Sequence, residues 1–141
     1  MTRAELIQQI AEHYGSAPEY IFRDDDDTAV FRHSNNRKWF AIVMKVPARS
    51  LGLGGPEPLD VVNFKADPFY IGSLLGQPGF LPAYHMNKTH WISALLEPDP
   101  RDGGPRRMPV TPAPDEDIHL LLDQSFELTG VRPPVFTDAD R

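Results

Sequence analysis

The sequence predicts a single α+β domain in which N- and C-terminal helices cover one face of a largely antiparallel sheet. Three observations carry this prediction. The chain has 141 residues, which is the usual size of one globular domain. Apolar residues follow helical spacing at both ends of the chain, and strand patterns alternate with turn residues between them. Helices at the two ends of a run of hairpins are typical of the α+β class.

Both terminal helices carry signals that mark where they begin and end. Thr2 and Glu5 form the pattern of a capping box, and Gly15 suits the end of the first helix. The last helix begins near Asp115, continues to Thr129 and starts with three acids that complement the helix dipole. We expect its buried stripe to contain Ile118, Leu121, Leu122 and Ser125, with Leu128 or Thr129.

A hairpin should follow the first helix, with strands near residues 28–34 and 37–46. Asn35 and Asn36 would form its two-residue turn, because asparagine tolerates the left-handed conformation that such a turn requires. Phe31 would then lie opposite Phe40, and Arg32 opposite Trp39. The core-like face would contain Ala29, Phe31, Phe40, Ile42, Met44 and Val46. The face open to a polar partner would contain Val30, Arg32, Trp39, Ala41, Val43 and Lys45.

Two further strand regions and a short helix complete the predicted domain. Residues 59–65 form a strand, and Asp67 followed by Pro68 starts the short helix. A second hairpin covers residues 80–96, with its turn at Asn87 and Lys88. Its last strand is nearly all apolar, which indicates a central position in the sheet.

Prolines are concentrated in one segment. The chain has 15 prolines, about double the usual share of roughly 5%. Six of them lie in residues 97–114 together with two adjacent glycines, which predicts a loop insertion because proline interrupts both helices and sheets. We therefore expect one domain over residues 1–130 and a loose tail over residues 131–141.

Composition excludes several classes of function. The chain has no cysteine, so it cannot form disulfides, thiolate zinc sites or iron–sulfur clusters, or use a cysteine nucleophile. It shows no apolar signal core and no long apolar run, so we expect a cytoplasmic protein without a membrane partner. The net charge of -6 argues against a basic surface over the whole molecule. No pattern implies a cofactor, and a monomer is the favoured state.

Two suggestive segments are interpreted as loops. The four consecutive carboxylates of residues 24–27 lack the alternating spacing of a calcium site, so we favour a solvated loop over a calcium or iron site. Residues 52–55 are glycine-rich, but Pro-Glu-Pro follows where a phosphate-binding loop needs the start of a helix.

The most distinctive side chains lie around the predicted turn at Asn87. That turn would pair His85 with His90 on one face and Tyr84 with Trp91 on the other. Paired imidazoles can form part of a metal site or act as general acid and base, but no third ligand or nucleophile accompanies them. We favour structural or surface histidines, and we place His13, His33 and His119 on the surface too. A small-molecule or metal-binding protein or an enzyme, using His85, His90 and Tyr84, is the alternative.

Four blocks of the sequence resemble a known family. They are residues 38–41 (KWFA), 62–68 (VNFKADP), 84–91 (YHMNKTHW) and 123–128 (DQSFEL). In this order they resemble the MmcQ/YjbR family, and the similarity runs from about Thr2 to Thr129. The resemblance implies a small cytoplasmic bacterial protein with a CyaY-like α+β fold and a double-wing motif predicted to bind DNA; the family is largely uncharacterised. The same fold analogy makes iron handling at residues 24–27 a third hypothesis.

Charge is distributed unevenly between the hairpins and the rest of the chain. Residues 28–46 hold four basic residues and no acid, and residues 80–96 add Lys88, so the hairpins total +5 and the remainder -11. Such segregation suits a local phosphate-binding face, and a solvated open sheet face would give the same pattern. We predict a non-enzymatic binding module whose nucleic-acid-binding residues, with DNA as partner, are Arg32, Arg37, Lys38, Trp39, Asn63, Lys65, Asn87, Lys88 and His90.

Overall fold

The computed structural model describes residues 1–99, 101 and 111–130. These residues contain a five-stranded sheet of order β1-β2-β3-β5-β4 in which all four strand pairings are antiparallel. The elements are α1 (Arg3–Tyr14), β1 (Ala29–Arg32), β2 (Trp39–Pro47), the 3-10 helix η1 (Ala48–Leu51), β3 (Pro58–Lys65), α2 (Pro68–Leu74), β4 (Phe80–Pro82), β5 (Trp91–Leu95) and α3 (Asp115–Thr129).

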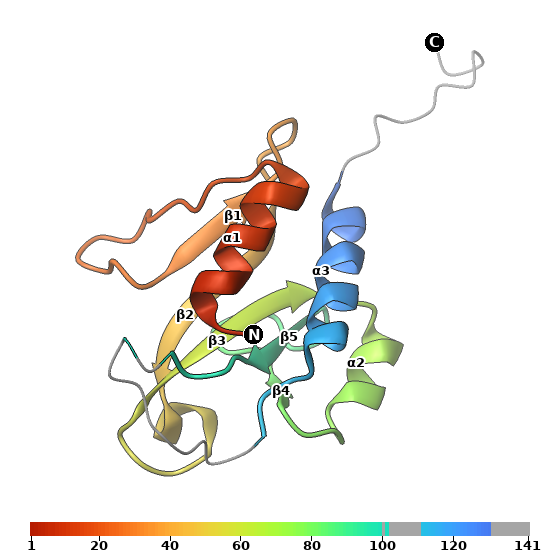
Figure 1. Ribbon diagram of the computed structural model, residues 1–141. Helices are drawn as coiled ribbons and strands as arrows, with labels where there is room; N and C mark the ends of the chain where they lie inside the picture. The colour runs from red at the N-terminus through yellow and green to blue at the C-terminus, as the bar shows by residue number, and fades with distance from the viewer. Residues whose placement is uncertain (100, 102–110, 131–141) are drawn as a thin grey trace.

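The three helices pack on one face of the sheet, which we call the helix face. In Figure 1, α1 and α3 lie side by side in front of the strands, and Gln9 of α1 contacts His119 of α3. Buried side chains of all three helices join the strand residues of this face in one core cluster. Each fully buried large apolar side chain stabilises the fold by about 1.5–3 kcal/mol. The predicted α+β class is confirmed.

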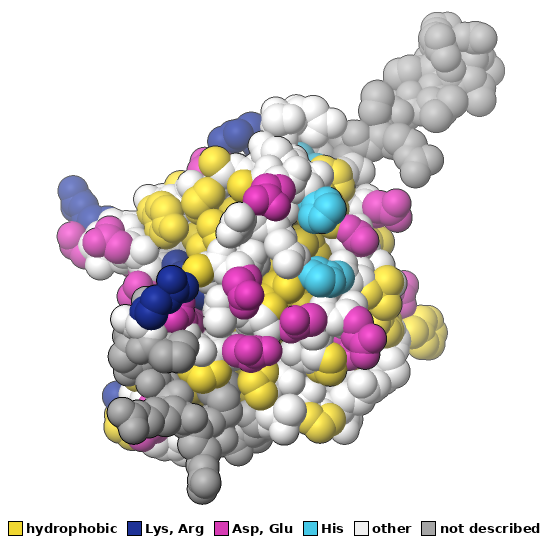
Figure 2. Space-filling model, in the orientation of Figure 1, with side chains coloured by type: hydrophobic (Ala, Val, Ile, Leu, Met, Phe, Trp, Pro, Cys, Tyr) yellow, Lys and Arg dark blue, Asp and Glu magenta, His cyan; other side chains and the backbone are white. Residues whose placement is uncertain are grey.

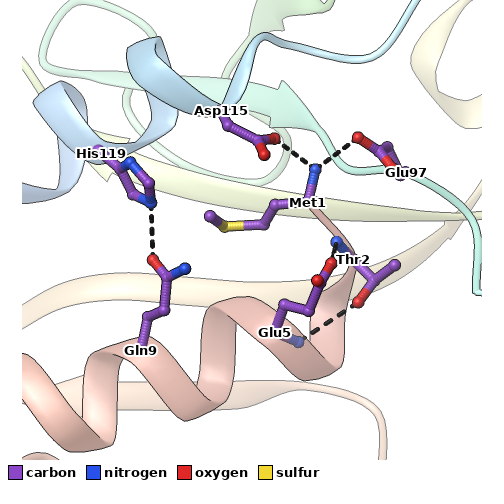
Figure 3. Close-up of polar contacts among 7 residues, drawn as sticks. All are labelled: Met1, Thr2, Glu5, Gln9, Glu97, Asp115 and His119. Atoms are coloured by element: carbon purple, nitrogen blue, oxygen red, sulfur yellow. Dashed lines mark hydrogen bonds and ion pairs between the residues drawn. The ribbon is translucent and has the colours of Figure 1, made fainter.

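The predicted ends of α1 are also confirmed. Figure 3 shows the capping box: Glu5 N–H donates to Thr2 Oγ1 at 3.3 Å, and Thr2 N–H donates to Glu5 Oε1 at 2.8 Å. Gly15 ends the helix in the left-handed conformation, with φ 62°. Helix α3 has the predicted bounds, and its stripe ends at the buried Thr129 while Leu128 stays exposed.

The α-amine of Met1 ties three parts of the fold together. It donates to Glu97 Oε1 at 2.7 Å, just after β5, and to Asp115 Oδ1 at 2.5 Å, at the start of α3 (Figure 3). Burial alone would lower the pKa of this amine, but hydrogen bonds and charge interactions with the two carboxylates outweigh burial and raise it. The amine therefore stays protonated while it bridges the two acids.

The first hairpin differs from the prediction in its turn and its register. The connection covers residues 33–38, with Arg37 at φ 63°, so the two-residue turn was wrong. Arg32 does lie opposite Trp39, but Phe31 lies opposite Ala41. The residue left over, Phe40, is a bulge: it adds one residue to β2 and shifts the register of everything beyond it.

This bulge also changes which side chains share a face. Phe40 and Ala41 both join the helix-face cluster, and Val43 follows them. Ile42, Met44 and Val46 therefore point to the opposite face, together with Trp39 and Val30. The predicted core face, which grouped Ile42 with Phe31, was wrong because a strand alternates its side chains and a bulge resets the alternation. We call the second surface the open face, because no α-helix of the described chain packs on it; the 3-10 helix η1 contributes Ala48 and Leu51 to its cluster.

The second hairpin is shorter than predicted. Strand β4 ends at Pro82, and its pairing with β5 places Pro82 opposite Ile92. Residues 83–90 form a loop instead of extending the ladder, and His85 has φ 55°. The predicted pairing of His85 with His90 was therefore wrong. The central position of β5 is confirmed, because it lies between β3 and β4.

Of the remaining predictions, the cap of α2 lies within the described residues, and most of the proline-rich insertion and the tail lie outside them. Asp67 caps α2 as expected, and its carboxylate accepts the N–H of Phe69 at 2.9 Å. Most of the predicted proline-rich insertion, residues 100 and 102–110, and the whole tail of residues 131–141 lie outside the described residues. Within the described part, no helix is long and apolar enough to cross a membrane.

Candidate nucleic-acid interface

The antiparallel ladder brings the loops of the two predicted basic hairpins to one side of the sheet. By edge we mean here the side at which β1, β3 and β4 end and β2 and β5 begin. β1 ends at Arg32 where β2 begins, and β3 ends at Lys65 opposite the first residue of β5, Trp91. The loops of residues 33–38 and 83–90 therefore leave the same edge. Three strand spacings separate them, or about 14 Å at about 4.8 Å per strand. We call this surface the basic edge; its cationic side chains are Arg37, Lys38, Lys65 and Lys88.

The exposure of these cations differs. Lys38 and Lys88 are exposed, Lys65 is half-buried, and the side chain of Arg37 is 60% exposed. Arg37 shares Glu19 with Arg32: its Nη2 lies 3.3 Å from Glu19 Oε1. Glu19 therefore neutralises part of the positive charge at the first loop.

Arg32, one of the predicted nucleic-acid-binding residues, has a half-buried side chain that contacts Glu19 and Trp39. Its Nε lies 3.4 Å from Glu19 Oε1, an ion pair without hydrogen-bond geometry. Its guanidinium lies 5.8 Å from the centre of the Trp39 ring, as in a cation–π contact. Phe22 meets the same ring edge to face, with 6.3 Å between the ring centres. Arg32 therefore orients Trp39, which is half-buried at the border of the open face.

The second loop is organised by Asn87. Its side-chain oxygen accepts the N–H groups of Thr89 at 2.8 Å and His90 at 3.3 Å, and its carbonyl accepts Trp91 N–H at 2.9 Å. This is how asparagine side chains stabilise tight turns. Asn87 therefore shapes the loop, whereas Lys88 and His90 project from it as exposed side chains.

Asn63 does not belong to the surface. It is wholly buried, so the predicted contact with a partner is corrected. Its amide nitrogen donates to the Tyr84 carbonyl at 3.0 Å, and its oxygen accepts Ser93 Oγ at 2.5 Å. Ser93 in turn accepts Tyr84 N–H at 2.9 Å. Asn63 and Ser93 thus fix the start of the 83–90 loop from inside the sheet.

The predicted cross-strand pair of His85 and His90 does not form, because both lie in the loop of residues 83–90. His85 is exposed and stacks on Tyr84, with ring centres 4.0 Å apart and an interplanar angle of 12°. Across the described residues, no three His, Asp or Glu side chains are grouped so that they could hold a metal ion. The carboxylates of residues 24–27 are not part of such a group either. The Asp25 carboxylate instead accepts hydrogen bonds from Thr28 and from the N–H of Asp27.

His33 is a further correction, because it is buried rather than on the surface. Its Nε2 lies 2.7 Å from Thr129 Oγ1, and its ring packs 4.3 Å from the centre of Phe126. Burial lowers the pKa of His33 below its usual value of 6.5, and a hydrogen bond to the Phe126 backbone opposes this only in part. His33 therefore anchors the first loop to the end of α3.

Acidic side chains gather on the helical layer of the fold. Figure 2 shows them spread over the face that α1 and α3 form. Three of them, Asp115, Glu116 and Asp117, start α3. Part of the negative charge of the chain thus lies on the helical layer, whereas the cations of the two loops lie at the sheet edge.

The comparisons with known proteins agree with this architecture. The YjbR family profile matches residues 11–128, which is most of the described chain. The chain belongs to the YjbR family. The uncharacterised YjbR relative YyaQ of Bacillus subtilis is 34% identical over 129 residues, covering 92% of this chain and 98% of YyaQ.

Solved structures of relatives show the same fold. A Pseudomonas syringae protein determined by crystallography is 39% identical, with a TM-score of 0.79 over 92% of this chain and 100% of that one. A Pseudomonas syringae solution structure gives 37% identity and a TM-score of 0.77, covering 97% of this chain and 99% of that one. A Deinococcus radiodurans protein is 26% identical, with a TM-score of 0.59, and the match covers 99% and 85% of the two chains. These YjbR-type structures support the fold and leave the biochemical role open.

Sequence reasoning missed the buried network that supports the site. Asn63 and Ser93 are polar residues inside two apolar strands, and such an interruption was the available signal for a buried hydrogen-bond network. It also missed Phe22, which contacts Trp39 from a loop 17 positions earlier in the chain. No local pattern predicts a contact of this kind.

Proposed function

We propose that this YjbR protein binds single-stranded nucleic acid, DNA in the first place, along the basic edge of its sheet. The strand order carries the proposal, because it brings both positively charged loops and the end of β3 to one edge. Exposed lysine and arginine side chains bind phosphates largely without regard to sequence. We therefore expect weak sequence preference.

The dimensions of the edge suit a short stretch of backbone. The two loops are about 14 Å apart, a span that a few nucleotides of an extended single strand bridge. Lys38 and Lys88 would bind phosphates at the ends of this stretch, with Lys65 between them. Trp39 adds half-buried aromatic surface beside the first loop, where a base can stack.

The number of cations sets the expected salt dependence. If Arg37, Lys38, Lys65 and Lys88 each neutralise one phosphate, the slope of log K against log salt is about -2.8 for single strands. Affinity should then fall about 50-fold between about 50 and 200 mM salt. The pairing of Arg37 with Glu19 makes this an upper limit.

Fluorescence anisotropy with labelled oligonucleotides tests the proposal. Lys38→Gln and Lys88→Gln should each reduce the salt slope by about 0.7 and weaken binding several-fold at low salt. Arg49→Gln is the matched control, since Arg49 is exposed on η1, at the opposite end of β2. Absence of binding at low salt overturns the proposal, and so does an equal loss in the Arg49→Gln variant.

A further inference from the structure

The open face carries a groove that shares only Trp39 with the proposed nucleic-acid binding. Its volume is about 590 Å³, and β2 supplies its floor through Trp39, Ile42, Met44 and Val46. One wall comes from residues 22–28 and the other from residues 84–86. Small-molecule sites commonly have volumes of roughly 300–1,000 Å³ and mostly apolar linings.

The wall of residues 84–86 is held in a fixed position. Tyr84 is bound through both its N–H and its carbonyl by Ser93 and Asn63, which are wholly buried. The next residue, His85, has φ 55°, a conformation that residues other than glycine rarely adopt. Its ring stacks on Tyr84 at 4.0 Å, and both side chains line the groove. Backbone strain that the surroundings maintain in this way is common at binding sites.

The lining combines adaptable apolar contacts with positive charge. Met44 and Met86 lie on the floor and on the wall, and methionine adjusts its shape to flat ligands. Arg23 and Lys45 are the two permanent cations of the lining, and Asp25 is its one carboxylate. The Asp25 oxygens already accept from Thr28 and from the N–H of Asp27. Asp25 stays ionised, because these hydrogen bonds lower its pKa, and Lys45 is paired with Asp60. Arg23 is the one cation of the lining for which the described residues supply no ion pair, so an anion would be attracted beside Arg23.

The geometry points to a binding site for a small organic anion, namely a flat apolar or aromatic body that carries one carboxylate or similar group. The body contacts Met44, Met86 and Trp39 on the β2 side. The anionic group lies beside Arg23. Lys45 also holds Asp60, at 3.1 Å, so Arg23 supplies most of the attraction. This proposal does not rest on the proposed nucleic-acid binding, although the two sites share Trp39.

Methionine methyl NMR with the full chain tests the site, using 2-naphthoate as the probe and 2-naphthol as its uncharged counterpart. The methyl signals of Met44 and Met86 should shift in a saturable manner with both probes. The Met1 signal should not shift, because Met1 is buried in the helix-face core. Met1 therefore serves as an internal reference.

Variants then locate the two parts of the ligand. Arg23→Gln should weaken 2-naphthoate about threefold, the effect expected of one exposed ion pair, and leave 2-naphthol unchanged. Met86→Ser should weaken both probes. Phe69→Ser is the matched control, because Phe69 is 92% exposed on α2, outside the groove, and it should change neither affinity.

Three results overturn the proposal. The first is that the methyl signals of Met44 and Met86 show no saturable shift at millimolar probe. The second is that Met86→Ser leaves the probe-induced shift of Met44 intact. The third is that, without probe, the Met44 and Met86 signals depend on protein concentration and sedimentation shows a dimer. The last result assigns the face to a second copy of the chain. Lys88→Gln should leave probe binding unchanged, so failure of this site and failure of nucleic-acid binding are separate outcomes.

Discussion

The hydroxyl of Ser125 joins α3 to the two central strands where the β2–β3 ladder stops. It donates to the Phe40 carbonyl at 2.6 Å and accepts Lys65 N–H at 2.9 Å. Ser125 is wholly buried. In a regular antiparallel ladder these two backbone groups would bond to each other beyond the pair Ala41–Phe64. The serine hydroxyl therefore supplies hydrogen-bond partners to the Phe40 carbonyl and Lys65 N–H, which the Phe40 bulge keeps from bonding to each other.

Ser125→Ala leaves both backbone groups buried without a partner. Each lost partner costs about 1–3 kcal/mol, and the better helix propensity of alanine returns about 0.5 kcal/mol. The free energy of unfolding should fall by about 1.5–5.5 kcal/mol. With an unfolding entropy of about 2.1 cal/mol/K per residue over 141 residues, a loss of 3 kcal/mol lowers Tm by about 10 °C.

Urea unfolding and a thermal melt, both followed by circular dichroism, measure this effect. Ser73→Ala is the matched control, because Ser73 is an exposed helical serine whose hydroxyl donates to the Tyr70 carbonyl of its own helix. It gains the same helix propensity and loses no buried partner. The reasoning is refuted if Ser125→Ala costs no more than about 0.5 kcal/mol beyond Ser73→Ala, within the spread of ordinary surface changes.

Two further predictions concern backbone space and pH. Gly79→Ala should lower the free energy of unfolding in urea by about 3 kcal/mol or more, because Gly79 has φ 89° and a Cβ would lie 2.3 Å from the nitrogen of Ala113. Gly15→Ala is the control: Gly15 has φ 62° and no atom within 4 Å of the added Cβ, so this change should cost only about 1–2 kcal/mol. Equal costs for the two variants would contradict the clash at Gly79. The lowered pKa of His33 means that the unfolded chain takes up its proton first, so the urea midpoint should fall as pH drops below about 6.5. His33→Gln should remove much of this fall, and an unchanged pH profile would count against it.

Local signals predicted the helices well. The capping box at Thr2 and Glu5, and the cap of α2 at Asp67, involve residues within three positions of one another. A helix also repeats its apolar positions within one segment. The necessary information is therefore present in a short stretch of sequence, which is why these boundaries are confirmed almost to the residue.

The hairpins were less predictable because distant residues determine their geometry. The Phe40 bulge is satisfied by Ser125, which lies 85 positions away. The 83–90 loop is held by Asn63, 21 positions before Tyr84. The turn at Asn35 and Asn36 and the turn at Asn87 and Lys88 looked like short primed turns, yet both became longer loops. A turn motif sets the connection only where no tertiary contact competes with it.

The candidate site was predicted in part for the same reason. Exposed cations such as Lys38 and Lys88 were found from charge alone, and their common edge follows from the strand order. The buried role of Asn63 was not predicted, because alternation along β3 placed it on the open face without showing that a loop covers it. The groove was missed because the bulge moved Ile42 and Met44 to that face.

The 83–90 loop serves the two proposed sites with different residues, and Asn87 divides them. Tyr84, His85 and Met86 precede it and line the groove, whereas Lys88 and His90 follow it and are exposed. Since the Asn87 side chain holds the loop through two hydrogen bonds, to Thr89 N–H and His90 N–H, its replacement would disturb both groups at once. An Asn87 variant therefore cannot assign a function to this segment. Met86→Ser and Lys88→Gln, which change one side of the loop each, can assign naphthoate binding and oligonucleotide binding separately.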